Sequence, residues 1–152
     1  MNKEAIKILT SEPCASWLRE RWRERGPQID DLVNTSRNDF FHLSAHRLQA
    51  VADFRIYGMT MWWLPRVEDF LGENGLLRQA GAWHYDFKHI GKRRPQLYIG
   101  KAIMSGAAWE VWDDDSALLV FAQALQWLLE QREAEEENTF AIEGLSVMEE
   151  GT

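Results

Sequence analysis

The sequence predicts an α+β fold, in which N-terminal helices pack with an αβββα module that contains a three-stranded antiparallel sheet. Three segments of alternating apolar and polar residues lie close together in the second half of the chain, at 82–90, 96–103 and 107–112. Such alternation is typical of strands that bury one face. The connections between them are short and contain glycine, which favours antiparallel pairing of neighbouring strands.

A helix is expected on each side of these strands. Pro65 can open the first helix, because proline fits the first turn, and Gly72 ends it after Leu71. The second helix begins at 113–116, where three aspartates and a serine can accept hydrogen bonds from free N–H groups. Its apolar residues continue to about residue 134 and cover more than one side. We therefore expect one side to cover the sheet and another to meet the N-terminal helices or a second copy of the chain.

The N-terminal half is predicted to be helical. A helix is expected from Ser11, as its N-cap, to about Arg25, where a Gly-Pro pair stops it. A short helical piece follows at 29–33. A longer helix runs from residue 38 or 39 to residue 56, because its apolar positions approximate a helical stripe. The first ten residues are expected to form a loose leader or a short helix.

These expectations divide the chain into a helical region at 1–58, the αβββα module at 59–134 and an acidic tail at 135–152. The segment 59–64 is apolar, and we expect it to be a connector whose aromatic side chains pack between the two parts. An apolar connector favours one packed unit over two separate domains. A chain of 152 residues is long enough for one such core.

Composition and charge limit the classes of function. The net charge of −7 is distributed unevenly: 110–152 carries −11, whereas 1–60 carries +1 and 61–109 carries +3. This distribution argues against nucleic acid as the main partner, because phosphate contacts need clustered cations. The chain has one cysteine, Cys14, no apolar run long enough to span a membrane and no N-terminal signal pattern. A cytoplasmic protein without a cofactor or a membrane contact is expected.

One cluster has the residue types of a metal site, namely His84, Asp86 and His89. On a strand, His84 and Asp86 point to the same side, whereas His89 has the opposite parity and would need a bulge or bend to join them. Ordinary outward positions on a half-exposed strand are the simpler interpretation. A small metal-dependent hydrolase is the hypothesis that this cluster supports.

A second candidate site is a basic edge at the turn between the first two predicted strands. Its cations are Lys88, Lys92, Arg93, Arg94 and Lys101. Tyr85, Phe87 and Tyr98 lie near them in sequence, and a sheet with cations and aromatic rings can bind single-stranded nucleic acid. A solvated basic loop, or a loop that docks onto an acidic protein surface, is the alternative.

No set of residues has the pattern of a catalytic site. Cys14 falls in the first turn of a predicted helix, where a thiol pKa can decrease, but no base lies near it in sequence. Eight tryptophans indicate a Trp-rich core, some of whose members can instead line an interface. The interface candidates are Trp62, Trp63 and Trp127. We therefore expect a binding protein rather than an enzyme.

The second half of the chain also resembles a known type of domain. The segment 64–71 (LPRVEDFL), the aromatic strand that follows Gly81, and the Asp-capped helix rich in Ala and Leu carry the likeness. Over about residues 64–133 they resemble small phage- and prophage-type αβββα domains of uncharacterised function. The resemblance implies an accessory protein of a phage or mobile element and assigns no catalytic residue. A protein that acts by protein–protein contact or self-association is therefore the leading hypothesis.

Overall fold

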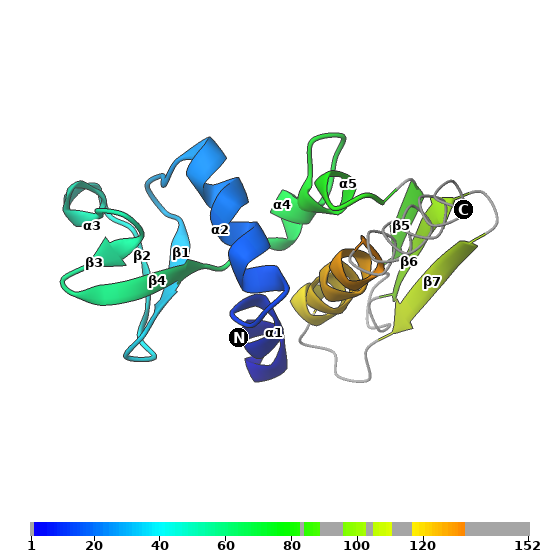
Figure 1. The fold of residues 1–152 in the computed structure, drawn as a ribbon, viewed down its shortest axis with the longest axis horizontal. Helices are drawn as coiled ribbons and strands as arrows, with labels where there is room; N and C mark the ends of the chain where they lie inside the picture. Colours follow the sequence, from blue (N-terminus) through cyan, green and yellow to red (C-terminus); the bar gives the residue numbers. More distant parts are fainter. Residues whose placement is uncertain (1, 83, 89–95, 103–104, 111–116, 133–152) are drawn as a thin grey trace, which may run out of the picture.

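The computed structural model describes residues 2–82, 84–88, 96–102, 105–110 and 117–132 (Figure 1). It confirms the α+β class, because helices are combined with two antiparallel sheets. Figure 1 shows a four-stranded sheet at one end of the molecule and a three-stranded sheet at the other. The two N-terminal helices and the helix at 117–132 lie between the sheets.

Two helices open the chain. In α1 (Lys3–Leu9), the side chain of Asn2 caps the N-terminus by accepting a hydrogen bond from the backbone N–H of Ala5 at 3.0 Å. The next helix, α2 (Cys14–Arg25), is confirmed, and it ends where predicted, at Gly26 with φ of +86°. The predicted N-cap is wrong, because α2 begins three residues after Ser11.

The region from residue 29 to residue 56 is not mainly helical, which corrects the prediction. The strands β1 (Leu32–Thr35), β2 (Phe40–His42) and β3 (Arg55–Ile56) lie there, together with the short helix α3 (Ala45–Ala50). Asn38 adopts φ of +64° and turns the chain instead of starting a helix. Asp53 and Phe54 also have positive φ, so no right-handed helix can continue through them.

The expected connector at 59–64 is largely a strand, β4 (Met59–Trp63). Its residues alternate between buried and half-buried positions, with Met61 and Trp63 on the buried side. β4 is a central strand of the antiparallel order β2-β1-β4-β3, in which Trp63 lies opposite Val33. The sheet therefore crosses the expected boundary at residue 58, and the region before that boundary contains strands as well as helices.

The second half follows the prediction more closely. Two short helices, α4 (Val67–Phe70) and α5 (Leu76–Gln79), precede three strands in the antiparallel order β5-β6-β7. The strands are β5 (His84–Lys88), β6 (Gln96–Ala102) and β7 (Ser105–Glu110). A helix at 117–132 ends the described part, and its expected start at 113–116 lies outside the described residues. None of the helices in the described part is long and apolar enough to cross a membrane.

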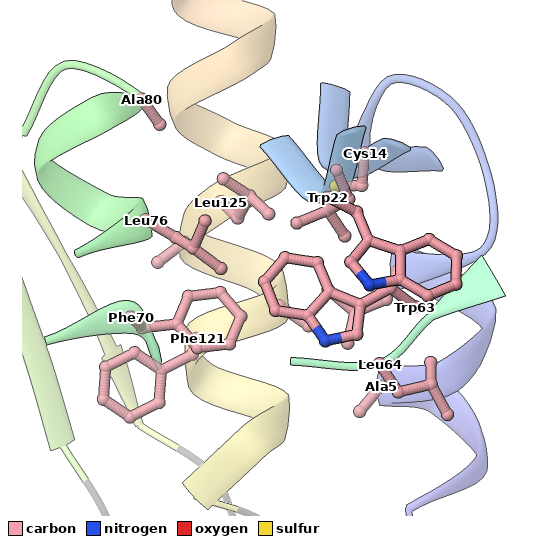
Figure 2. Packing of buried hydrophobic residues seen from close by; sticks show 14 of the residues in the cluster. Ala5, Cys14, Trp22, Trp63, Leu64, Phe70, Leu76, Ala80, Phe121 and Leu125 are labelled. Carbon is pink, nitrogen blue, oxygen red and sulfur yellow. The ribbon is translucent and has the colours of Figure 1, made fainter. Parts of the chain in front are cut away.

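One cluster of buried apolar residues joins these elements. Figure 2 shows Phe70, Leu76, Phe121 and Leu125 on one side of this cluster, with Trp22, Trp63 and Leu64 on the other. The ring of Phe121 lies 5.3 Å from that of Phe70 and 4.7 Å from that of Phe87, so the helix at 117–132 packs against both α4 and β5.

Asp31 connects the end of α2 to the beginning of β1. Its Oδ2 accepts hydrogen bonds from the indole N–H of Trp22 at 2.9 Å and from the backbone N–H of Gln28 at 2.8 Å. Both carboxylate oxygens also lie 2.8 Å from the guanidinium of Arg25. The carboxylate thus provides the partner that a buried tryptophan N–H requires.

Candidate functional site

The residues of the predicted metal site are only partly described. His84 and Asp86 lie two positions apart on β5, opposite Gly100 and Tyr98 of β6. Asp86 is exposed. His89 lies outside the described residues, and in the described part of the chain no three His, Cys, Asp or Glu residues gather to hold a metal ion. The metal site therefore stays a prediction.

The basic edge is also described only in part. Lys92, Arg93 and Arg94 lie outside the described residues, while Lys88 lies opposite Gln96 and Lys101 lies at an irregularity in the β6–β7 pairing. The three aromatic residues expected near these cations are divided between the two faces of the sheet. Tyr85 and Phe87 pack against the core, whereas Tyr98 is 46% exposed on the other face. The described face thus offers one ring for stacking instead of three, and nucleic-acid binding here stays a prediction.

Two of the three interface candidates, Trp63 and Trp127, belong wholly or partly to the core. Trp63 is 7% exposed, and the guanidinium of Arg25 lies 4.9 Å from its ring centroid. Trp62 is half-buried on β4, on the opposite face of the strand from Trp63. Trp127 is partly buried against the core cluster. Trp63 and Trp127 thus contribute to the chain's own core, and an interface role for the three tryptophans stays a prediction.

Cys14 is buried at the start of α2. Burial, together with the negative charges of Glu130 and Glu12, raises the pKa of its thiol to about 12. Burial and these charges therefore outweigh the decrease in thiol pKa that a helix N-terminus can cause. The thiol of Cys14 stays protonated and unreactive at neutral pH.

A wide opening lies elsewhere, between α1 and the hairpin that β1 and β2 form. We call it the α1–hairpin groove, and its volume is about 750 Å³. Ligand pockets commonly have volumes in this range. The groove is lined by Lys3, Ile6, Lys7, Thr10, Asn34, Asn38 and Phe40.

One wall of the groove is a single side of α1. Its four lining residues follow the spacing i, i+3, i+4 and i+7, which places them on one helix face. The opposite side of α1 carries Ala5 and Leu9, which are buried in the core. Because those residues anchor the helix, the side chains of Lys3 and Lys7 are held one turn apart along the groove.

The other wall is the β1–β2 hairpin. Asn34 lies directly opposite Phe40 on β2 and Trp62 on β4, so the three residues form a row across one face of the sheet. The turn between the strands is fixed by Thr35, whose Oγ1 accepts hydrogen bonds from the backbone N–H groups of Arg37 and Asp39. These contacts hold the ring of Phe40 at the groove, where it is 44% exposed.

The groove combines positive charge, an apolar ring and an amide. Both lysines are exposed, and within the described residues neither forms an ion pair. Asn34 is only 6% exposed, and its Nδ2 donates to the carbonyl oxygen of Asp39 at 3.2 Å. That bond fixes the amide orientation and leaves Oδ1 without a hydrogen-bond partner among the described residues. The groove can therefore accept a hydrogen bond, contact an apolar group and neutralise acidic groups.

The sequence interpretation missed this site because it assigned the hairpin wall to a helix and left the α1 wall open between a leader and a short helix. Residues 1–10 were expected to be a leader or short helix, and Phe40 was assigned to a long helix. The available signals were Asn2 as an N-cap before Lys3 and an Asn-Asp pair at 38–39 that suits a hairpin turn.

Comparisons with protein-family models, with curated proteins and with solved structures gave no significant match for this chain.

Proposed function

We propose that this chain is a non-catalytic accessory protein, of the phage or mobile-element type, that acts by binding another protein. The α1–hairpin groove is its contact surface, and the bound segment of the partner is acidic and carries an aromatic or large aliphatic side chain. The observation that supports this most directly is the exposed ring of Phe40, which lines the same groove as two lysines that form no ion pair with any described residue.

The apolar part of the proposal depends on Phe40. Large aromatic side chains contribute a disproportionate share of the binding energy in protein interfaces when a partner covers them. Phe40 belongs to a strand whose neighbours position it firmly, so little conformational entropy is lost when a partner packs on it. A partner side chain on this ring would also cover Ile6, which is half-buried on the opposite wall.

The acidic part depends on Lys3 and Lys7. Complementary charges at the edge of an interface mainly accelerate association and select against wrong partners. Two ammonium groups one helical turn apart match carboxylates spaced along an acidic segment. The resemblance of 64–133 to phage-type domains supports the accessory role, and it is independent of the groove.

The test is capture of partners from the native host with the full chain and four variants, each checked by circular dichroism. Phe40→Ala removes the ring and Lys3→Glu with Lys7→Glu reverses the charge of the groove. Tyr98→Ala is the matched aromatic control, because Tyr98 is also a strand residue and has nearly the same exposure, 46% against 44%. Arg132→Glu reverses an exposed charge on another element.

We expect a stoichiometric partner that is retained by both controls and lost with both groove variants. Binding should weaken at least about tenfold for the charge reversal and should also weaken as salt rises, because exposed charges are screened. A partner that binds Phe40→Ala and the lysine variant as well as it binds the native chain would exclude the groove as the contact surface.

A further inference from the structure

We propose that the groove has an occupant within the chain's own sequence, the acidic segment 133–152 of a second copy. This inference rests on the proposed function of the groove and names its partner. Two copies would exchange these segments reciprocally, so that each groove holds the segment of the other copy.

The charge of the chain is divided in a way that suits this contact. All 17 Lys and Arg residues precede residue 133, together with 17 of the 24 acidic residues, so 1–132 is neutral. The segment 133–152 contains seven glutamates and no Lys or Arg, and it therefore carries the whole net charge of −7. A segment of this kind is attracted to cations, and Lys3 and Lys7 supply two of them at the groove.

The same segment contains the apolar group that the groove needs. Phe140 and Ile142 lie between the glutamates at 135–137 and Glu143. A segment that combines acidic residues with an apolar pair matches a groove whose lining combines an exposed ring with two ammonium groups. The backbone N–H groups of such a segment can donate to Oδ1 of Asn34, which accepts no hydrogen bond from the described residues.

The position of the last helix favours a second copy over the same chain. In Figure 1, the end of the helix at 117–132 is directed toward β5–β7, whereas the groove lies on the other side of the molecule, between α1 and the β1–β2 hairpin. The end of this helix and the groove of the same copy therefore lie on different sides of the molecule. Reciprocal exchange between two copies gives a closed dimer.

The experiment is sedimentation velocity of the full chain over about a hundredfold range of concentration, because dimerisation follows mass action. Two variants carry opposite charge reversals. The groove variant contains Lys3→Glu and Lys7→Glu, and the tail variant contains Glu135→Lys, Glu136→Lys and Glu137→Lys. Their equimolar mixture restores opposite charges at both contacts, since each native or reversed stretch 135–137 meets a groove of opposite sign.

We expect the native chain to dimerise as its concentration rises at low salt. Each variant alone should dimerise at least about tenfold more weakly, and the equimolar mixture of the two variants should form the dimer again. A native chain that stays monomeric throughout, or a groove variant that dimerises normally, would overturn the inference. A mixture that stays monomeric would also overturn it, because tail and groove would then not meet between copies. None of these results would remove the proposed function, which is judged separately by whether partner capture requires Phe40.

Discussion

At the scale of single residues, the carboxylate of Asp31 accepts hydrogen bonds from three different residues. It accepts from a buried indole N–H, from a backbone N–H and from a guanidinium, and its side chain is 11% exposed. Asp31→Ala leaves the N–H of Trp22 buried without an acceptor. We expect a loss of about 3 kcal/mol in the free energy of unfolding, measured by chemical denaturation.

The control for Asp31 is Glu24→Ala. Glu24 pairs with Arg21 at 3.6 Å, but its side chain is 64% exposed, so the pair is screened by solvent. A change below about 0.5 kcal/mol is expected for this variant. Similar losses for the two variants would mean that Asp31 does not organise the end of α2.

Cys14 makes stability depend on pH in the alkaline range. The pKa of its thiol is about 12 in the folded chain, against an ordinary value of 9.0. Above pH 9 the unfolded chain releases a proton that the folded chain keeps, so the folded state loses stability as pH rises from 9 toward 12. We expect the difference in unfolding free energy between native chain and Cys14→Ala to fall over this range. A difference that is constant with pH would show that the thiol ionises normally.

The same burial predicts how Cys14 reacts with thiol reagents. At pH 8 the native protein should be labelled far more slowly than the protein in denaturant, because the protonated thiol is both buried and a poor nucleophile. The measurement is the ratio of the two labelling rates. Rapid labelling of the folded chain would contradict the buried position of this residue.

At the scale of elements, β4 is the strand whose assignment is most open to test. Met61 is fully buried and Thr60, the next residue, is half-buried. Met61→Ala should cost about 2–4 kcal/mol, because it removes buried methylene groups and leaves a cavity, whereas Thr60→Ala should cost less than about 1 kcal/mol. Equal costs, measured by denaturation, would fit an irregular connector and not a strand with one buried side.

The elements differ in how far the sequence predicts them. The three-stranded sheet is predicted correctly because 82–90 and 96–103 alternate over several residues and short turns separate them. β1, β2 and β3 contain four residues or fewer, which is too short for alternation to be distinguished from a helical stripe. The turns at Asn38 and at Asp53-Phe54 depend on positive φ angles, which tertiary packing stabilises and which the residue types alone do not specify.

The candidate site could not be predicted for a related reason. Its walls come from α1 and from the β1–β2 hairpin, and Lys3 and Phe40 line one groove only because the fold brings these two elements to the same opening. Local sequence signals indicate each element but not their contact. The predicted metal site at 84–89 and the basic edge at 88–101 each lie within one short stretch of the chain. The sequence can therefore indicate them, whereas the groove combines residues from distant stretches.

At the scale of the whole molecule, the central question is whether the two sheets belong to one cooperative unit, as the sequence predicts. The core cluster runs from Val33 and Met61 through Trp22 to Phe121 and Ile99, so apolar contacts extend from one sheet to the other. Figure 2 shows the middle of this path, where Leu125 lies between the α4–α5 side and Trp22. A continuous core of this kind favours a single unfolding transition.

Phe121→Ala tests this continuity, because the ring is fully buried between Phe70 and Phe87 and lies in the half of the molecule that contains β5–β7. We expect a loss of about 3–5 kcal/mol. If the molecule unfolds as one unit, hydrogen exchange measured by mass spectrometry should accelerate equally in β1, β4 and β6. If hydrogen exchange accelerates only in 67–132, while β1 and β4 stay as protected as in the native chain, the two sheets unfold independently. The N-terminal half would then hold the groove in place by itself.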